Sequence, residues 1–174
     1  MNEKVKETLK TILTYVLIVF TVIIIRIFFI DPVRVDGRSM DTTLQNGEIM
    51  LLNKIVYRKK DIKRFDIVVI NQDNKLIIKR VIGLPGETIE YKNNELLIDG
   101  RKIDDPYPST STDDFSIEDI GHVKIPGDTY FVMGDNRSNS LDSRYPSVGV
   151  INKSKILGRA RFIIWPINRF GTVK

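Results

Sequence analysis

Apolar residues fill one unbroken segment near the N-terminus and form only short runs in the rest of the chain. Residues 11–30 read TILTYVLIVFTVIIIRIFFI, and Arg26 carries the only charge. A helix of this length crosses a hydrocarbon core of about 30 Å. Apolar side chains would cover every face of this helix, whereas a helix packed on a soluble core has one apolar stripe. The pattern predicts a membrane-spanning helix over residues 11–30.

The residues that flank this segment indicate an uncleaved anchor. The apolar run is longer than the core of a usual signal peptide, and the sequence at its end, FFIDPVRV, is too bulky for a cleavage site. Lys4, Lys6 and Lys10 precede the segment, and Arg34 and Arg38 follow it. By the positive-inside rule, charge counting favours a cytoplasmic tail over residues 1–10 and an exported domain over residues 31–174, by a thin margin.

Beyond Pro32, short apolar runs alternate with turn residues such as Pro85-Gly86, Asn93-Asn94 and Pro126-Gly127. Runs of this kind are typical of strands. We expect strands at residues 48–53, 65–70, 75–82, 87–91, 95–100, 122–125, 129–134 and 160–165. The predicted fold class is mostly β, with a single N-terminal transmembrane helix followed by one antiparallel β-sheet domain. Residues 104–120 predict a long surface loop.

The composition narrows the chemistry of this domain. The 27 Lys and Arg exceed the 22 Asp and Glu by five, but the excess is spread along the chain and gives no support to nucleic-acid binding. The absence of cysteine excludes disulfides and cysteine nucleophiles. His122 is the only histidine and falls on a predicted short strand, so we expect no zinc site and no cofactor. The basic run at residues 57–64 either contacts anionic lipid or, more simply, forms an exposed turn.

Three polar segments remain that could carry chemistry. Ser39 follows the apolar segment closely, so its hydroxyl would lie near the membrane surface. Lys79 and Arg80 interrupt a predicted strand on opposite faces, and one of the two must therefore point toward packed apolar residues. A desolvated lysine can lose several pKa units from about 10.4 and become a base near neutral pH. The third segment, residues 134–144, is densely polar. Together they suggest Ser-Lys chemistry, although a turn serine and an edge-strand lysine are each commonly structural.

The same three segments resemble the sequence boxes of the bacterial type I signal peptidases, in order and behind a membrane anchor. Residues 39–44, SMDTTL, are similar to the box S-M-x-P-T-L, with Thr42 in place of the proline. Residues 79–87, KRVIGLPGE, are similar to K-R-x-x-G-x-P-G-D, with Glu87 in place of Asp. Residues 134–144, GDNRSNSLDSR, fill every fixed position of G-D-N-R-x-x-S-x-D-S-R. The short length and single span resemble the Gram-positive branch.

The resemblance implies a role for each matching residue. Ser39 would be the nucleophile, Lys79 the general base and Ser140 the hydroxyl that orients the lysine amine. The remaining site residues would be ion-pair and hydrogen-bond supports, namely Arg80, Asp135, Asp142 and Arg144. Because Gly37 stands where another branch has a serine hydroxyl, the oxyanion hole would use backbone N–H groups of Ser39 and Gly37, chiefly that of Ser39. Shallow pockets for small substrate residues would be lined by Val33, Val35, Met40, Leu44 and Ile78.

The resemblance further implies a membrane-bound serine endopeptidase that removes signal peptides from exported preproteins after small residues at −1 and −3. Its partners would be signal peptides and the lipid bilayer, and it would need no metal or organic cofactor. Two alternatives are a peptidase specialised for one dedicated precursor and a non-catalytic anchored β domain that binds export intermediates. Thr42 removes a φ restraint beside Ser39 but replaces no reacting group.

Overall fold

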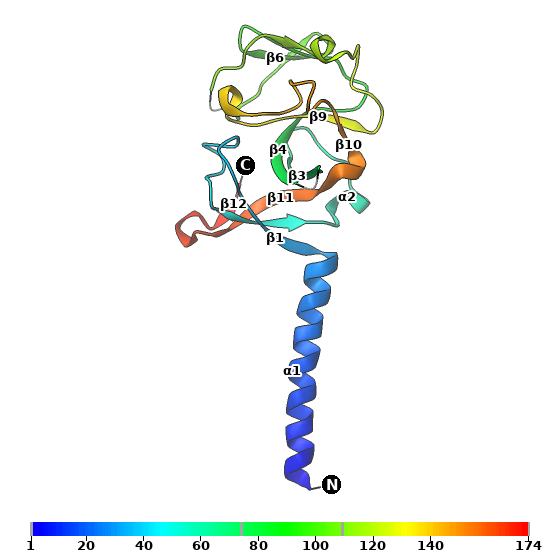
Figure 1. Ribbon diagram of the computed structural model, residues 1–174, viewed down its shortest axis with the longest axis vertical. Coiled ribbons are helices and arrows are strands. Elements are labelled where there is room, and N and C mark those ends of the chain that lie inside the picture. The colour runs from blue at the N-terminus through cyan, green and yellow to red at the C-terminus, as the bar shows by residue number, and fades with distance from the viewer. Residues whose placement is uncertain (1, 74, 109, 174) are drawn as a thin grey trace.

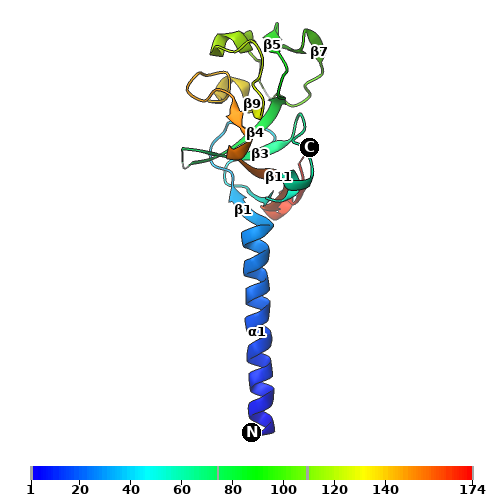
Figure 2. The ribbon, with the colours of Figure 1, turned by 90° about the vertical axis from the view of Figure 1, so that its right-hand side faces the viewer.

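A computed structural model describes residues 2–73, 75–108 and 110–173 of the chain. One long helix, α1 (Glu3–Phe28), projects from a β domain (Figures 1 and 2). None of its side chains is buried, and within the described residues it is the one helix that is long and apolar enough to cross a membrane. It ends two residues before the predicted boundary, because Ile30 already pairs with Asn53 as the first residue of a strand.

The larger of two antiparallel sheets carries the strands on which the site is built. Its strand order is β1-β2-β11-β3-β4-β9-β10, and β12 also pairs with β11. The strands are β1 (Ile30–Arg34), β2 (Ile49–Asn53), β3 (Ile67–Gln72), β4 (Lys75–Gly83), β9 (Thr129–Met133), β10 (Ile151–Asn152), β11 (Ile156–Trp165) and β12 (Gly171–Thr172). Short helices flank this sheet, namely α2 (Val56–Lys59), η2 (Arg137–Asn139), η3 (Lys153–Lys155) and η4 (Ile167–Arg169).

A smaller four-stranded sheet lies at the end of the domain far from α1 (Figure 1). Its order is β7-β6-β5-β8, and one short helix follows β8. Its elements are β5 (Ile89–Lys92), β6 (Glu95–Ile98), β7 (Arg101–Ile103), β8 (Phe115–Ser116) and η1 (Ile117–Ile120). A buried apolar cluster joins this sheet to the larger one through residues such as Ile89, Leu96 and Phe131. The fold class predicted from the sequence is therefore confirmed.

Two local predictions were wrong. Residues 122–125 form no strand: Ile125 instead exchanges backbone hydrogen bonds with Gly86 and Glu87, and Val123 is exposed. Residues 104–120 are not simply a surface loop. They include β8 and η1, and they bury Thr112, Phe115 and Ile117 because this segment covers the loop that follows β9.

Strand β1 was not expected, because the continuous apolar run ends at Asp31-Pro32 and proline is unfavourable in strands. Proline donates no backbone hydrogen bond, so it is tolerated in a sheet mainly at an edge. β1 is an edge strand, in which Pro32 lies opposite Leu51. Since only one residue separates this strand from α1, the helix is joined directly to the sheet.

Gly158 allows the close approach of β11 and β2. A Cβ atom at this position would overlap the backbone carbonyl of Asn53. We expect Gly158→Ala to cost about 2 kcal/mol, and hence to lower Tm by roughly 5 °C, because backbone atoms must move to relieve the overlap. Thermal melting of the full chain in detergent measures this loss. Gly127→Ala is the matched control, since a Cβ there meets nothing within 4 Å, and equal melting of the two variants would contradict the prediction.

Candidate active site

Ser39 lies in the irregular segment between β1 and β2, which is held in place by the loop that follows β9. The carbonyl oxygen of Ser39 accepts a hydrogen bond of 3.0 Å from the backbone N–H of Asn136. The side-chain amide of Asn136 donates to the carbonyl of Arg38 at 3.1 Å. Thr43 donates its hydroxyl hydrogen to Asp135. Ser39 itself is half-buried, so its position is fixed while its side chain remains accessible.

Lys79 is buried on β4, with 4% of its surface exposed. Its amine donates a hydrogen bond of 3.0 Å to the hydroxyl oxygen of Ser140. Burial lowers the pKa of Lys79 from 10.5 to about 8, because the charged amine loses its hydration. Asp142 and Asp135 act in the opposite direction, and Arg144 lowers the pKa further. A substantial fraction of the amine is therefore neutral near physiological pH.

Arg80, the next residue on β4, is buried on the opposite side of the strand but is fully paired. Its guanidinium donates to both carboxylate oxygens of Asp135, at 2.8 and 2.7 Å. It also donates to the carbonyl of Phe65 at 2.9 Å and stacks 3.6 Å from the ring centroid of Tyr107. A bidentate pair of this kind fixes Asp135, and with it the loop that holds Ser39. The two adjacent cations of β4 thus have different partners: the Lys79 amine donates to a neutral hydroxyl, whereas the Arg80 guanidinium contacts a carboxylate directly.

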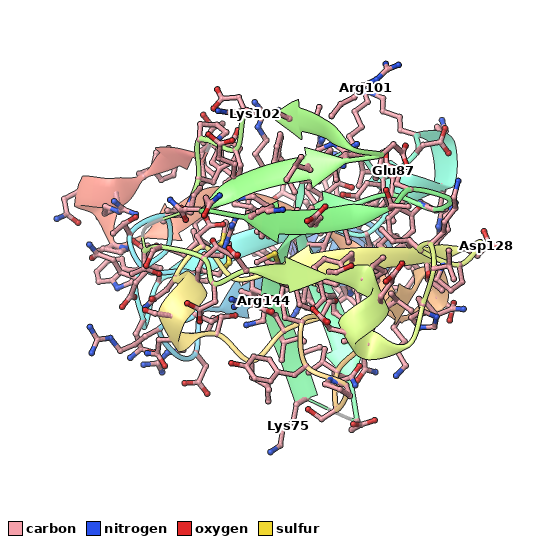
Figure 3. The ribbon with its side chains drawn as sticks, turned by 90° about the horizontal axis from the view of Figure 1, so that it is seen from above. Lys75, Glu87, Arg101, Lys102, Asp128 and Arg144 are labelled. Atoms are coloured by element: carbon pink, nitrogen blue, oxygen red, sulfur yellow. The ribbon has the colours of Figure 1, made fainter. Side chains whose placement is uncertain are left out.

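Asp142 and Arg144 form a second buried pair beside Lys79. Arg144 donates to the two oxygens of Asp142 at 2.9 and 3.0 Å, and Asp142 accepts from the backbone N–H of Gly134 at 3.0 Å. In the view from above, Arg144 lies beneath the small sheet (Figure 3). Gly134 lies in close contact with the segments of both serines. A Cβ atom at this position would overlap the Ser140 hydroxyl and the Ser39 carbonyl. The resemblance-derived support residues are therefore brought together in one network.

Arg137 is a site-linked residue to which the sequence reasoning gave no role. It is 2% exposed and donates to the carbonyl of Gly134 at 3.0 Å. Its other donors reach Asp105 at 2.6 Å, Tyr91 at 2.8 Å and Thr112 at 3.1 Å. These three partners come from the small sheet and from the segment predicted as a surface loop. The sequence did offer one signal for this role, since Arg137 lies inside the third box. Its three partners, however, are 25 to 46 residues away in the sequence and could not be identified from the box.

Ser39 and Lys79 line one cavity of about 570 Å³ between residues 34–40 and the β3–β4 hairpin. Val35, Met40 and Ile78, three of the five residues predicted to line substrate pockets, contribute to its wall. Val33 and Leu44 do not line this cavity but are buried in the apolar cluster that also contains the wall residues, and their role in substrate pockets stays a prediction. At the hairpin, Lys75 projects outward (Figure 3).

The backbone donors near Ser39 are not equivalent. The N–H of Gly37 already donates to the side-chain oxygen of Asn46 at 2.9 Å. The prediction that Gly37 supplies an oxyanion donor is therefore not supported by this geometry. In the described part of the chain, no hydrogen-bond acceptor is found for the N–H of Ser39, a residue that lines the cavity.

The single histidine lies apart from this cavity. His122 is half-buried, and its backbone N–H donates to the carbonyl of Ile117, away from the residues that line the cavity. Among residues 2–73, 75–108 and 110–173, no three His, Cys, Asp or Glu side chains are grouped so that they could hold a metal ion.

The chain thus combines an apolar N-terminal helix with an antiparallel β domain. One cavity of this domain is lined by a serine and a buried lysine. The family model described as "Signal peptidase, peptidase S26" matches residues 5–165. The chain belongs to this family, which confirms the relationship inferred from its sequence boxes.

Individual relatives agree with this assignment. The chain is 41% identical to signal peptidase I S of Bacillus subtilis strain 168 over 172 residues, which cover 95% of this chain and 93% of that protein. It is 41% identical to signal peptidase I of Bacillus amyloliquefaciens over 165 residues, or 91% of this chain and 89% of that protein. The crystal structure of a signal peptidase I from Enterococcus faecalis V583 matches with a TM-score of 0.52 and 34% identity, covering 57% of this chain and 97% of that chain.

The buried amine of Lys79 must lower the stability of the domain at neutral pH. Its folded-state pKa of about 8 lies below the ordinary value of 10.5, so charging the buried amine costs about 3 kcal/mol below pH 8, a cost that disappears as the pH rises above 10.5. We expect Lys79→Met to raise the stability at pH 7 by about 1–2 kcal/mol after the loss of the Ser140 hydrogen bond.

Thermal melting of both chains at pH 7 and near pH 10.5 measures this effect. The advantage of Lys79→Met should be largest at pH 7 and should shrink at the higher pH, where the folded lysine is neutral and about half of the unfolded lysine is neutral. Lys75→Met is the control, because Lys75 is exposed on the same strand. An advantage that is independent of pH would contradict the proposed cost of charging Lys79.

Proposed function

We propose that this protein is a membrane-anchored serine endopeptidase that removes signal peptides from exported preproteins. The observation that carries the proposal is the amine of Lys79, which is buried, hydrogen-bonded to a hydroxyl and lowered in pKa, in the same cavity as Ser39. A neutral amine beside a serine can activate its hydroxyl without a histidine. The names of the relatives, all signal peptidases I, support the same activity.

In the proposed mechanism, Ser39 Oγ attacks the scissile carbonyl carbon and its proton passes to the neutral Lys79 amine. The resulting tetrahedral intermediate carries a negative oxygen, which the N–H of Ser39 can stabilise. When the C–N bond breaks, the Lys79 ammonium gives its proton to the leaving amine. Water, deprotonated by the same amine, then attacks the acyl-enzyme ester and releases Ser39. Ser140 would orient the amine throughout. The Arg80–Asp135 pair would hold the loop after β9 against β4, and the Asp142–Arg144 pair would brace the part of the same loop that carries Ser140.

An extended peptide fits the cavity better than a folded one. β4 pairs with β3 from Lys75 to Arg80 but pairs with β9 only from Arg80 onward. In the described residues, the second edge of β4 from Lys75 to Lys79 is therefore unpaired where it faces the cavity, and an extended peptide can add to such an edge. The walls formed by Val35, Met40 and Ile78 leave shallow apolar pockets, which we infer select small residues at −1 and −3.

The exposed apolar surfaces support anchoring of this enzyme in a bilayer. We infer a tail over residues 1–10, a span over 11–30 and a catalytic domain over 31–174, with the N-terminus cytoplasmic and the domain outside the membrane. The signal peptide of a preprotein lies in the same bilayer, so an anchored enzyme meets its substrate there. Trp165, Ile167 and Phe170, at the η4 end of β11, are also exposed and suit an interfacial position.

Two other functions remain as alternatives. A peptidase dedicated to one precursor would use the same site, and only its substrate range would differ. A non-catalytic domain that binds export intermediates would require the cavity but not the lowered pKa of Lys79. The desolvated amine favours catalysis, because a binding domain gains nothing from the cost of burying it.

Ser39→Ala should abolish cleavage of a preprotein, because it removes the attacking oxygen and leaves the rest of the site intact. Gel analysis of a purified preprotein mixed with the full chain in detergent measures processing, and we expect a loss of at least about 1000-fold. Thr42→Ala is the matched control, since its exposed hydroxyl lies on the same segment but outside the cavity, and it should retain activity. Substantial turnover by Ser39→Ala would exclude the serine mechanism.

The pH dependence of kcat/KM should follow the neutral form of Lys79. The rate should rise about tenfold per pH unit below pH 8 and level off above it, because the base must be unprotonated and its pKa is about 8. A fluorogenic peptide without titratable side chains provides the measurement. Lys79→Arg should be inactive at every pH, because a guanidinium does not release its proton in this range. A kcat/KM that keeps rising up to a pH of about 10.4, the ordinary pKa of lysine, would show that another group accepts the proton. Activity of the arginine variant would show the same.

A further inference from the structure

The short helix α2 is attached to the end of α1 through backbone contacts. The N–H of Lys54 donates to the carbonyl of Phe29 at 3.0 Å, directly after α1, and Asn53 lies opposite Ile30 in the β1–β2 pair. The side chain of Asn53 also accepts from the N–H groups of Ile55 and Val56, where α2 begins. In keeping with these contacts, α2 is on the side of the domain nearest to α1 (Figure 1). The segment therefore lies at the level where the apolar helix ends.

Charged residues mark that level as the boundary between hydrocarbon and water. Asp31 pairs with Arg26 at 3.4 Å and with Lys54 at 2.9 Å. Above this cluster the chain is a sheet, and below it α1 carries no charged side chain between Lys10 and Arg26. If α1 spans a bilayer, as the proposed function requires, lipid headgroups surround these three side chains and the adjacent α2.

Three consecutive basic residues extend from α2 at this level. Arg58, Lys59 and Lys60 are all exposed. Among the described residues, none of them forms an ion pair with a carboxylate, whereas nearby Arg64 and Arg159 are paired with Glu87 and Asp66. Within the described residues these three positive charges are therefore not neutralised by carboxylates, and they lie on a segment next to the end of α1.

We propose that Arg58, Lys59 and Lys60 bind the headgroups of anionic phospholipids and hold the catalytic domain close to the membrane surface. The proposal rests on the membrane anchoring in the proposed function. Each basic residue near an anionic surface raises the affinity for that surface about fivefold. A single helix leaves the domain free to tilt, so an electrostatic contact beside the helix restricts its orientation and keeps the cavity at a constant height above the bilayer.

Energy transfer from a dye near α2 to the bilayer tests this contact. The full chain has no cysteine, so Asp61→Cys, at an exposed position beside Lys60, gives a unique labelling site. The labelled chain is reconstituted in vesicles that carry an acceptor dye on a trace lipid. The vesicles contain phosphatidylcholine alone or phosphatidylcholine with about one-third phosphatidylglycerol. We expect energy transfer to increase with phosphatidylglycerol and the increase to decline at high salt.

The triple variant R58Q/K59Q/K60Q should lose at least half of this increase. The matched control is K92Q/R101Q/K124Q, which also removes one arginine and two lysines that are exposed and form no ion pair in the described structure. Its residues lie in or beside the small sheet, where Arg101 projects outward far from α1 (Figures 1 and 3). The control should respond like the unmodified chain. An undiminished increase in the first variant, or equal losses in both, would overturn the proposal.

Two further measurements on the same vesicles separate this proposal from the proposed function. Resistance to alkaline extraction tests the anchoring by α1, and cleavage of a signal-peptide substrate tests the catalytic activity. An anchored, active chain without the phosphatidylglycerol response would refute only the lipid contact. An anchored chain with the response but without cleavage would refute the peptidase and leave the lipid contact standing.

Discussion

The burial of one amine, that of Lys79, sets the conditions for the rest of the site. A buried lysine loses hydration, and the pKa of Lys79 falls to about 8 for this reason. The same burial would be too costly without a hydrogen-bond partner, which Ser140 supplies. Carboxylates in direct contact would restore the charge, and the two nearby acids are instead bound to Arg80 and Arg144. The domain thus keeps the amine poorly solvated while neutralising the acids around it.

Two buried ion pairs, Arg80–Asp135 and Arg137–Asp105, join segments that are distant in the sequence. Asp135 connects β4, through Arg80, with the segment of Ser39, through Thr43. Arg137 extends the same loop to Tyr91 and Asp105, so the small sheet braces the loop that presents Ser140. A buried pair adds little net stability, but the loss of one partner is costly. These pairs therefore fix the position of the loop after β9 relative to β4 and to residues 104–120. The stability of the domain comes mainly from its buried apolar clusters.

The direct junction of α1 and β1 couples this site to the apolar helix. Only one residue separates the helix from the sheet, and the segment of Ser39 begins at the other end of the same short strand. The distance of Ser39 from the end of the helix is therefore set by β1 and by its register with β2. Under the proposed function, this short connection would set the height of the cavity relative to the end of the apolar helix.

The amino-acid sequence determined the features that depend on local composition. The apolar helix, seven of the eight expected strands and the Ser39, Lys79 and Ser140 segments follow from hydrophobic runs and short motifs, which need no knowledge of distant contacts. Tertiary structure decided what depends on pairing between distant segments. The Pro32 segment pairs as an edge strand, whereas residues 122–125 pair with no strand. The N–H of Gly37 donates to Asn46, and Val33 and Leu44 are buried outside the cavity lining. A hydrogen-bond partner or a buried neighbour is fixed only when remote segments meet, and no local pattern of residues contains that information.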